Sequence, residues 1–354
     1  MKANLQPNMV VELPEGFTAR GAILEDLEIS VRLFNRWSRS VLGREEFADI
    51  ESIRDEWMAP GVDISEDVRH VFAPNGELVG HIEVWTNANP LVHPELWGRL
   101  DPDYEDLGIG TWMLQWAEQR ALRALPSVPD GLRFAPHVGT YRQAEKARKL
   151  FEDMRYQHIR STYHMVIEMD APVPEPEFPE GITLRTYNPG IDAEATYRAE
   201  QDAFRDHFGF VEKPFEEGLR QWKRSREHDG FDPTLYFLAM DGEEVAGISI
   251  CRPESYYDPD RGWVRSLGVR RPWRQRGLGL ALLRHSFNEF YRRDKRKVGL
   301  GVDPQNLTGA LRLYEGAGMR VDQAYDHYEK ELRPGTEIRV QSLSELNQTS
   351  PSNV

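Results

Sequence analysis

A run of arginines and glycines late in the chain has the chemistry to bind a diphosphate. Residues 270–279 read Arg-Arg-Pro-Trp-Arg-Gln-Arg-Gly-Leu-Gly and carry four positive charges in a chain whose net charge is −14. Glycines let backbone N–H groups approach a ligand closely, and the start of a following helix adds unpaired donors and partial positive charge. The spacing therefore predicts a phosphate-binding turn after a strand over 263–269. The structural alternatives are a tightly packed helix start and a solvated basic face.

The elements around this turn are predicted by the spacing of apolar residues. Apolar side chains three and four apart indicate a core-facing helix after the turn, with Leu280, Leu283, Phe287 and Phe290 on one face. A later helix is predicted from its own apolar face, Leu307, Ala310, Leu311 and Tyr314. Asn306 suits the N-cap of this later helix, and Gly318 suits the position just after its end. Strands and helices in this order favour a mixed sheet flanked by helices.

The sequence also repeats itself. Residues 14–20, PEGFTAR, return as PEGITLR 165 residues later, and the Asn75-Gly76 hairpin turn returns at Asp241-Gly242. We therefore expect two copies of one fold, an N-terminal domain over 8–170 and a C-terminal domain over 181–333. Four prolines in 171–180 predict a stiff extended linker, and the polar residues 334–354 predict a loose tail.

The two copies differ where the chemistry would be. The first copy has Asp-Pro-Asp-Tyr-Glu-Asp-Leu-Gly at 101–108, which carries −4 where 270–277 carries +4. It also has Phe151 where the second copy has Tyr314, and a phenyl ring cannot hydrogen-bond a leaving thiolate. These two differences predict that the N-terminal copy is degenerate and catalytically silent, while the C-terminal copy is active.

The second copy resembles the GNAT superfamily of acetyl-coenzyme A-dependent acyltransferases. Arg274, Gly277 and Gly279 match the phosphate-loop pattern Arg/Gln-x-x-Gly-x-Gly/Ala, and the later Asn306…Leu-Tyr-Glu…Gly-Met segment matches a second motif of that family. The first copy resembles the same fold in degenerate form, so the chain looks like the tandem acetyltransferases related to mycothiol synthase. The resemblance implies an α/β (α+β) tandem fold, with a mixed sheet flanked by helices in each copy.

The same resemblance implies acetyl-CoA as co-substrate and direct transfer of the acetyl group to an amine of a small molecule or peptide. The residues that it places against the coenzyme are Leu267, Gly268, Val269, Arg274, Gln275, Arg276, Gly277, Leu278, Gly279 and Asn306. Tyr314 would face the leaving sulfur. Because a phenol has a pKa near 10 and a thiol near 8.5, full proton donation is uphill by roughly 2 kcal/mol, which favours a hydrogen bond to the thiolate instead.

The sequence does not decide which residue is the general base. In mycothiol synthase-like relatives a glutamate lies early on the strand before the phosphate loop, whereas this chain has Trp263 there. Carboxylates in the neighbouring segments are the alternatives: Glu254, Asp258, Asp260 and Asp303. His207 is another candidate, because a histidine titrates near neutral pH and an acid, Asp206, precedes it. Water could also serve.

Composition limits the remaining functions. The acidic balance disfavours nucleic acid and anionic membranes as partners, and the N-terminal residues lack a signal-peptide pattern, so we expect a cytoplasmic protein. Cys251 is the only cysteine and the histidines lack metal-binding spacings, so neither a disulfide within the chain nor a metal site is predicted. Two rival functions remain, a non-catalytic acyl-CoA sensor and mycothiol synthase-like acetylation of a cysteinyl amine.

Overall fold

The computed structural model describes residues 11–45, 50–86, 91–207, 210, 213–227, 231–255, 258–305 and 309–339. Its backbone separates into two compact units. Unit 1 contains the chain up to Ser161 together with Tyr325–Ile338, and unit 2 contains Thr162–Ala324. None of the helices in the described part of the chain has the length and apolar character needed to cross a membrane.

Unit 1 is built on a sheet with the strand order β1-β2-β3-β4-β5-β12. Its first five strands are β1 (Thr18–Gly21), β2 (Val68–Phe72), β3 (Leu78–Trp85), β4 (Glu95–Leu100) and β5 (His137–Tyr141). Its helices are α1 (Leu27–Leu42), α2 (Ile50–Trp57), α3 (Ile64–Asp67), α4 (Ile109–Arg123) and α5 (Glu145–Asp153). Helices α4 and α5 pack into one apolar core with the sheet, while Leu33 and Phe34 of α1 pack into another.

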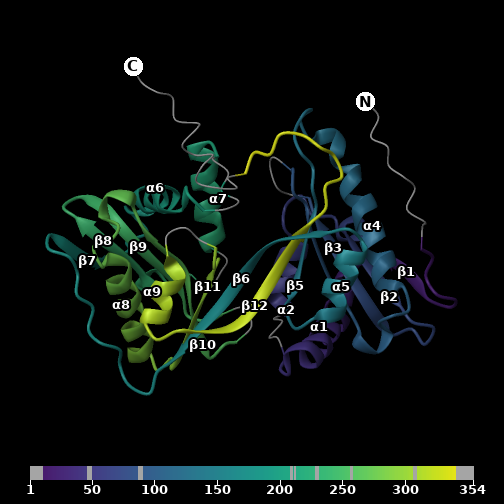
Figure 1. The fold of residues 1–354 in the computed structure, drawn as a ribbon, viewed down its shortest axis with the longest axis horizontal. Coiled ribbons are helices and arrows are strands. Elements are labelled where there is room, and N and C mark those ends of the chain that lie inside the picture. The colour runs from purple at the N-terminus through teal and green to yellow at the C-terminus, as the bar shows by residue number, and fades with distance from the viewer. Residues whose placement is uncertain are drawn as a thin grey trace. The chain divides into compact units, whose positions relative to one another are not determined.

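Unit 2 repeats this arrangement with the strand order β6-β11-β10-β9-β8-β7. Its own strands are β7 (Ile182–Thr186), β8 (Tyr236–Asp241), β9 (Glu244–Arg252), β10 (Arg261–Val269) and β11 (Lys297–Val302). Its helices are α6 (Ala193–Phe204), α7 (Phe215–Glu227), α8 (Leu278–Arg292) and α9 (Ala310–Gly316). Alternate residues of β8 enter different cores, because successive strand side chains point to opposite faces: Phe237 packs with α8, and Leu238 packs with α6 and α7. Helices α8 and α6 lie on either side of these strands (Figure 1).

The last strand of each sequence copy pairs in the other unit. Strand β6 (Gln157–Glu168) pairs antiparallel with β11, where Glu168 faces Lys297, and β12 (Arg320–Glu329) pairs antiparallel with β5, where Tyr325 faces Tyr141. The units therefore divide within these two strands, at 161/162 and 324/325, whereas the sequence placed the division in the proline-rich segment 171–180. That segment contains neither helix nor strand.

Most of the local elements expected around the arginine-glycine turn are present. Helix α8 buries Leu283, Phe287 and Phe290 completely. Helix α9 begins at Ala310, and its expected starting residues 306–307 lie outside the described residues. It ends at Gly316, and Gly318 takes the expected position just after the cap residue Ala317, with a φ of +93° and with the Met319 N–H donating to the Tyr314 carbonyl. The tail is ordered further than expected, because Leu132 and Phe134 form backbone bridges with Thr336 and Arg333.

Candidate active site

Two parallel strands of unit 2 separate next to the predicted phosphate turn. Strands β10 and β11 pair only from Arg261 opposite Lys297 to Val264 opposite Leu300. The pairing of β10 with β9 shifts register between Val264 and Ser266, which marks a bulge, and then continues to Val269. Residues 267–269 therefore present their other backbone edge to the opening between β10 and β11, where a ligand with amide groups could pair with them.

The turn between β10 and α8 presents a row of backbone N–H groups. Gln275 and Gly277 have φ values of +61° and +82°, and Gly277 caps α8 without a side-chain hydrogen bond. The first backbone bond into the helix runs from the Ala281 N–H to the Gly277 carbonyl. Among the described residues, no hydrogen-bond acceptor is assigned to the N–H groups of residues 275–280. Such a row at a helix N-terminus is a binding site for an anion.

Acidic residues neutralise most of the positive charge that the sequence places in this turn. Arg274 donates to Asp206 and to the carbonyls of Ala203 and Val269, each at 3.0 Å. Arg271 pairs with the same Asp206. Burial alone would raise the pKa of Asp206, but the hydrogen bonds from Arg271 and Arg274 hold it below its usual range. Arg274 therefore ties the turn to the end of α6 and has few donors left for a phosphate.

The remaining arginines of the turn, Arg270 and Arg276, differ in how many partners their guanidinium groups already have. Arg270 pairs with Asp202 at 2.9 Å and with Glu244 at 3.2 Å. Arg276 is exposed, and within the described residues it makes one hydrogen bond, a 3.4 Å contact with the Glu180 carbonyl. Of the four guanidinium groups, that of Arg276 is the one most able to turn toward a diphosphate.

Tyr314 lies on α9, which packs against the start of α8. A Cβ atom on Gly279 would lie 3.1 Å from the Leu313 side chain, so the glycine allows this close approach. Tyr314 is buried with 8% of its surface exposed, and burial raises its pKa to about 12. The phenol therefore stays protonated and is a hydrogen-bond donor at neutral pH.

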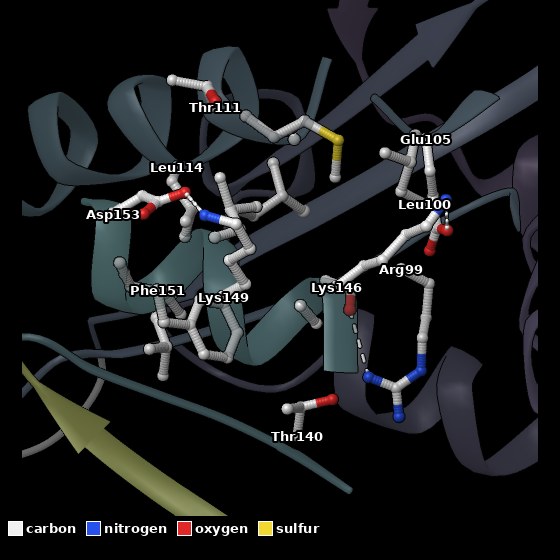
Figure 2. Close-up of a pocket in the computed structure, with 18 of the residues that line it drawn as sticks. Arg99, Leu100, Glu105, Thr111, Leu114, Thr140, Lys146, Lys149, Phe151 and Asp153 are labelled. Atoms are coloured by element: carbon white, nitrogen blue, oxygen red, sulfur yellow. Dashed lines mark hydrogen bonds and ion pairs between the residues drawn. The ribbon is translucent and has the colours of Figure 1, made fainter. Parts of the chain in front are cut away.

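Unit 1 contains the same backbone arrangement with different side chains. Strands β4 and β5 pair only at Glu95 opposite His137 and at the next residue of each strand. The turn before α4 repeats the positive φ values, +63° at Asp106 and +82° at Gly108, and the helix again begins without a side-chain cap. The opening beyond these paired residues holds a cavity of about 400 Å³, lined by residues of β4, β5, α4 and α5 (Figure 2).

Two lysines that line this cavity pair with carboxylates. Lys146 on α5 reaches Asp106 at 2.7 Å and Glu105 at 3.1 Å, and Lys149 pairs with Asp153 at 2.8 Å (Figure 2). Phe151, at the position of Tyr314, is buried in the α4–α5 core of unit 1. The entrance at which a diphosphate would bind is therefore lined by carboxylates and by lysines that already have partners.

Known proteins share this architecture. A family model described as "Acetyltransferase (GNAT) family" matches residues 193–319. The crystal structure of a GCN5-related N-acetyltransferase from Sphaerobacter thermophilus is 34% identical, has a TM-score of 0.80, and covers 94% of this chain and 100% of its own. A mycothiol acetyltransferase from Salinispora arenicola is 31% identical over 73% of this chain and 80% of its own length.

The chain belongs to the GNAT family. It is an acetyltransferase, and the predicted fold class is confirmed. A tandem GNAT protein from the clavulanic acid biosynthesis pathway, 15% identical with a TM-score of 0.67, shares the fold. Members of the GNAT family generally take their acyl group from acetyl-CoA.

Three of the predicted bases of this acetyltransferase, His207, Asp303 and Glu254, have a local partner in the structure. The His207 ring lies 4.5 Å from the Phe204 ring between centroids, and Asp303 accepts a hydrogen bond from the Gln305 N–H at 2.8 Å. Glu254 is exposed, 3.7 Å from Lys295. The geometry does not single out one of them as the base. Asn306, predicted to hold the coenzyme arm, lies outside the described residues.

Sequence reasoning missed a carboxylate beside the bulge of β10. Glu200 on α6 accepts a hydrogen bond from the Ser266 hydroxyl at 2.6 Å, and the Trp222 indole N–H donates to its other oxygen. It therefore positions the bulge from which residues 267–269 continue. No local sequence motif predicts this contact, because the two residues are 66 positions apart. Only the packing of α6 on the sheet brings them together.

Proposed function

We propose that unit 2 carries out the acetyl transfer with acetyl-CoA as its donor. The observation that carries the proposal is the opening between β10 and β11 beside the row of N–H groups at the start of α8. Unit 1 repeats this backbone, but only unit 2 has Tyr314 and an arginine-rich turn next to it.

The coenzyme would be held mainly by the backbone. Its diphosphate would accept hydrogen bonds from the N–H groups of residues 275–279, with Arg276 adding a flexible positive charge. The amide groups of its arm would pair with the backbone of residues 267–269. A backbone N–H at that edge would also stabilise the oxyanion that forms on the thioester carbonyl, and loss of one such donor typically costs 10²- to 10³-fold in rate.

The transfer itself needs a neutral amine. Its lone pair attacks the thioester carbon, the tetrahedral intermediate collapses with cleavage of the C–S bond, and the amine proton passes to a base or water. With the pKa of Tyr314 at about 12 and that of a thiol near 8.5, protonating the thiolate from this phenol would cost about 5 kcal/mol. Tyr314 therefore acts as a hydrogen-bond donor to the departing sulfur, and solvent supplies the proton.

The acceptor would be an amine of a small molecule or peptide. A second candidate, a cysteinyl amine, is favoured by the similarity to proteins named mycothiol acetyltransferase. Trp263, in the place of the glutamate expected from that resemblance, packs closely against Gly299, where a Cβ atom would lie only 2.8 Å from the indole. A base for either acceptor would have to come from elsewhere. The candidates are water and the side chains of Glu254, Asp258, Asp260, Asp303 and His207.

An acceptor screen tests this proposal. The full chain is mixed with acetyl-CoA and a panel of amines that includes a cysteinyl amine protected at sulfur, and released coenzyme thiol is measured. We expect release above the acceptor-free rate with at least one amine, together with an acetylated product by mass spectrometry. Tight binding of acetyl-CoA without release for any amine would contradict the proposal.

A further inference from the structure

Four side chains from distant parts of the sequence meet in unit 1, at the paired end of β4 and β5. The strand register brings two of them together, because Glu329 on β12 is directly opposite His137 on β5. The His137 N–H donates to the Pro94 carbonyl at 2.9 Å, which places the neighbouring His93 beside it, and the two imidazole centroids are 4.9 Å apart. Glu337 follows the bridge that Thr336 forms with Leu132.

His93 has an acceptor oxygen at each ring nitrogen. Its Nδ1 lies 2.9 Å from the Ala135 carbonyl, and its Nε2 lies 3.1 Å from Oε1 of Glu337. A neutral imidazole carries only one N–H, so one of these contacts would bring two acceptors together. A cation must resolve that conflict, either a second proton on the ring or a metal ion at Nε2. An imidazole whose Nδ1–H is fixed by a carbonyl is the usual form of a metal-binding histidine.

Arg133 orients both carboxylates of the group. It donates to Oε1 of Glu329 at 2.6 Å and to Oε2 of Glu337 at 3.2 Å. The opposite oxygen of each carboxylate faces a histidine, with Oε2 of Glu329 3.3 Å from Nε2 of His137. Arg133 therefore holds the carboxylates from behind, as outer residues do around bound metal ions.

The distances suit a small divalent ion. Zinc bonds of 2.0–2.2 Å in a tetrahedron place neighbouring ligand atoms about 3.3–3.6 Å apart. The two nitrogen–oxygen contacts in this group measure 3.1 and 3.3 Å, and one ligand atom each of His93, His137 and Glu329 lie within 4.8 Å of one another. Small side-chain rotations would therefore bring His93, His137 and Glu329 onto one ion, with Glu337 beside His93 as the fourth ligand.

We propose that His93, His137, Glu329 and Glu337 form a divalent-metal site, with zinc as the ion that their imidazole and carboxylate ligands suit best. The ligands span 244 residues of the chain, so an ion would fasten residues 329–337 to the strands of unit 1. Its role would be structural, because binding to the folded chain alone stabilises that fold. The proposal is independent of the transfer chemistry proposed for unit 2.

Metal content of the untagged full chain is the first measurement. The protein is stripped with a chelator, incubated with zinc, desalted and analysed by elemental mass spectrometry. We expect one zinc per chain in the wild type, a higher unfolding temperature with zinc than without it, and release of protons on binding. Cobalt bound in its place should give the visible absorption of a tetrahedral site.

Matched variants locate the ion. His137→Gln and Glu337→Gln should each weaken zinc binding at least 10- to 100-fold, the range seen even for outer residues of metal sites. Glu337 is outside the strands, so its replacement leaves the sheet pairing intact if His137→Gln fails to fold. His158→Gln removes an exposed histidine of the same unit as the control and should retain the zinc. Zinc uptake that is absent from the wild type, or equal in the wild type and Glu337→Gln, would overturn the proposal.

Discussion

The turns at 101–108 and 270–277 have nearly the same backbone and opposite charge. Both have two residues with positive φ before a fifteen-residue helix. An ion pair to the first α-helix of each unit is reversed between them, since Arg36 on α1 pairs with Asp101 and Asp202 on α6 pairs with Arg270. Backbone shape has thus been kept while the charges were exchanged together with their partners.

A second ion pair is the same in both units, which indicates that the fold itself requires it. Arg20 pairs with Asp26 in unit 1 and Arg185 pairs with Asp192 in unit 2, both through two hydrogen bonds of 2.6 and 2.7 Å. This pair has the same sense in both copies, as expected of a contact that the fold needs. The charge of the turn and the residue at the Tyr314 position differ, so the fold tolerates either choice, and we assign them to function.

The largest effect is expected at Tyr314. Tyr314→Phe removes the hydrogen bond proposed for the departing thiolate, so turnover should fall about 100-fold while the KM for acetyl-CoA changes little. Phe151→Tyr makes the reverse change in unit 1 and should leave turnover unaltered. Steady-state kinetics with an accepted amine measures both. Equal turnover in wild type and Tyr314→Phe would remove the role given to this residue.

The glycines of the two turns allow a matched comparison. Gly108→Ala and Gly277→Ala each force an alanine to φ near +82°, so both should lower the free energy of unfolding by about 1–2 kcal/mol. Only Gly277→Ala should also weaken acetyl-CoA binding, about 10-fold, because it distorts the row of N–H groups. Denaturant unfolding and calorimetry separate the two effects. Loss of acetyl-CoA affinity in Gly108→Ala alone would reverse the assignment of the copies.

A smaller effect is expected from the exposed arginine. Arg276→Glu reverses one charge near the diphosphate and should weaken acetyl-CoA binding roughly 5-fold at low salt, less at high salt. Leu107→Glu, at the corresponding place in unit 1, is the control and should change nothing. Binding titrations at two ionic strengths measure this, and a loss that does not depend on salt would argue against a direct role of the charge.

The smallest effect concerns pH and Asp206. Folding lowers the pKa of Asp206 from its unfolded value near 4. The ion pairs of Asp206 therefore stabilise unit 2 at pH values above about 4. This stabilisation is lost as the pH falls through the pKa of Asp206 in the folded chain. The difference in unfolding free energy between wild type and Asp206→Asn should therefore be constant above about pH 5 and shrink below pH 4. Unfolding at a series of pH values measures it, and a constant difference down to pH 2 would contradict the assignment.

Local patterns in the sequence predicted the turn, the buried face of α8 and the role of Gly318 just after the end of α9, because each depends on residues within a few positions. The pairing of β6 with unit 2 and of β12 with unit 1 could not be predicted. The alternation of inward and outward side chains along a strand is the same whichever sheet the strand joins. Asp202 looks like an ordinary helix-surface acid in the sequence, and Asp206 looks like a partner of His207, until α6 is packed beside Arg270 and Arg274. The His93–Glu337 group was missed for the same reason, because its ligands have no common motif.

We propose that unit 2, and in particular its turn at 270–277, holds the acetyl donor. The most direct test is a crystal structure of the full chain with coenzyme A. We predict density for the diphosphate against the backbone N–H groups of residues 275–279. Density against residues 106–110 alone, or at neither turn under conditions where calorimetry shows saturation, would contradict the account.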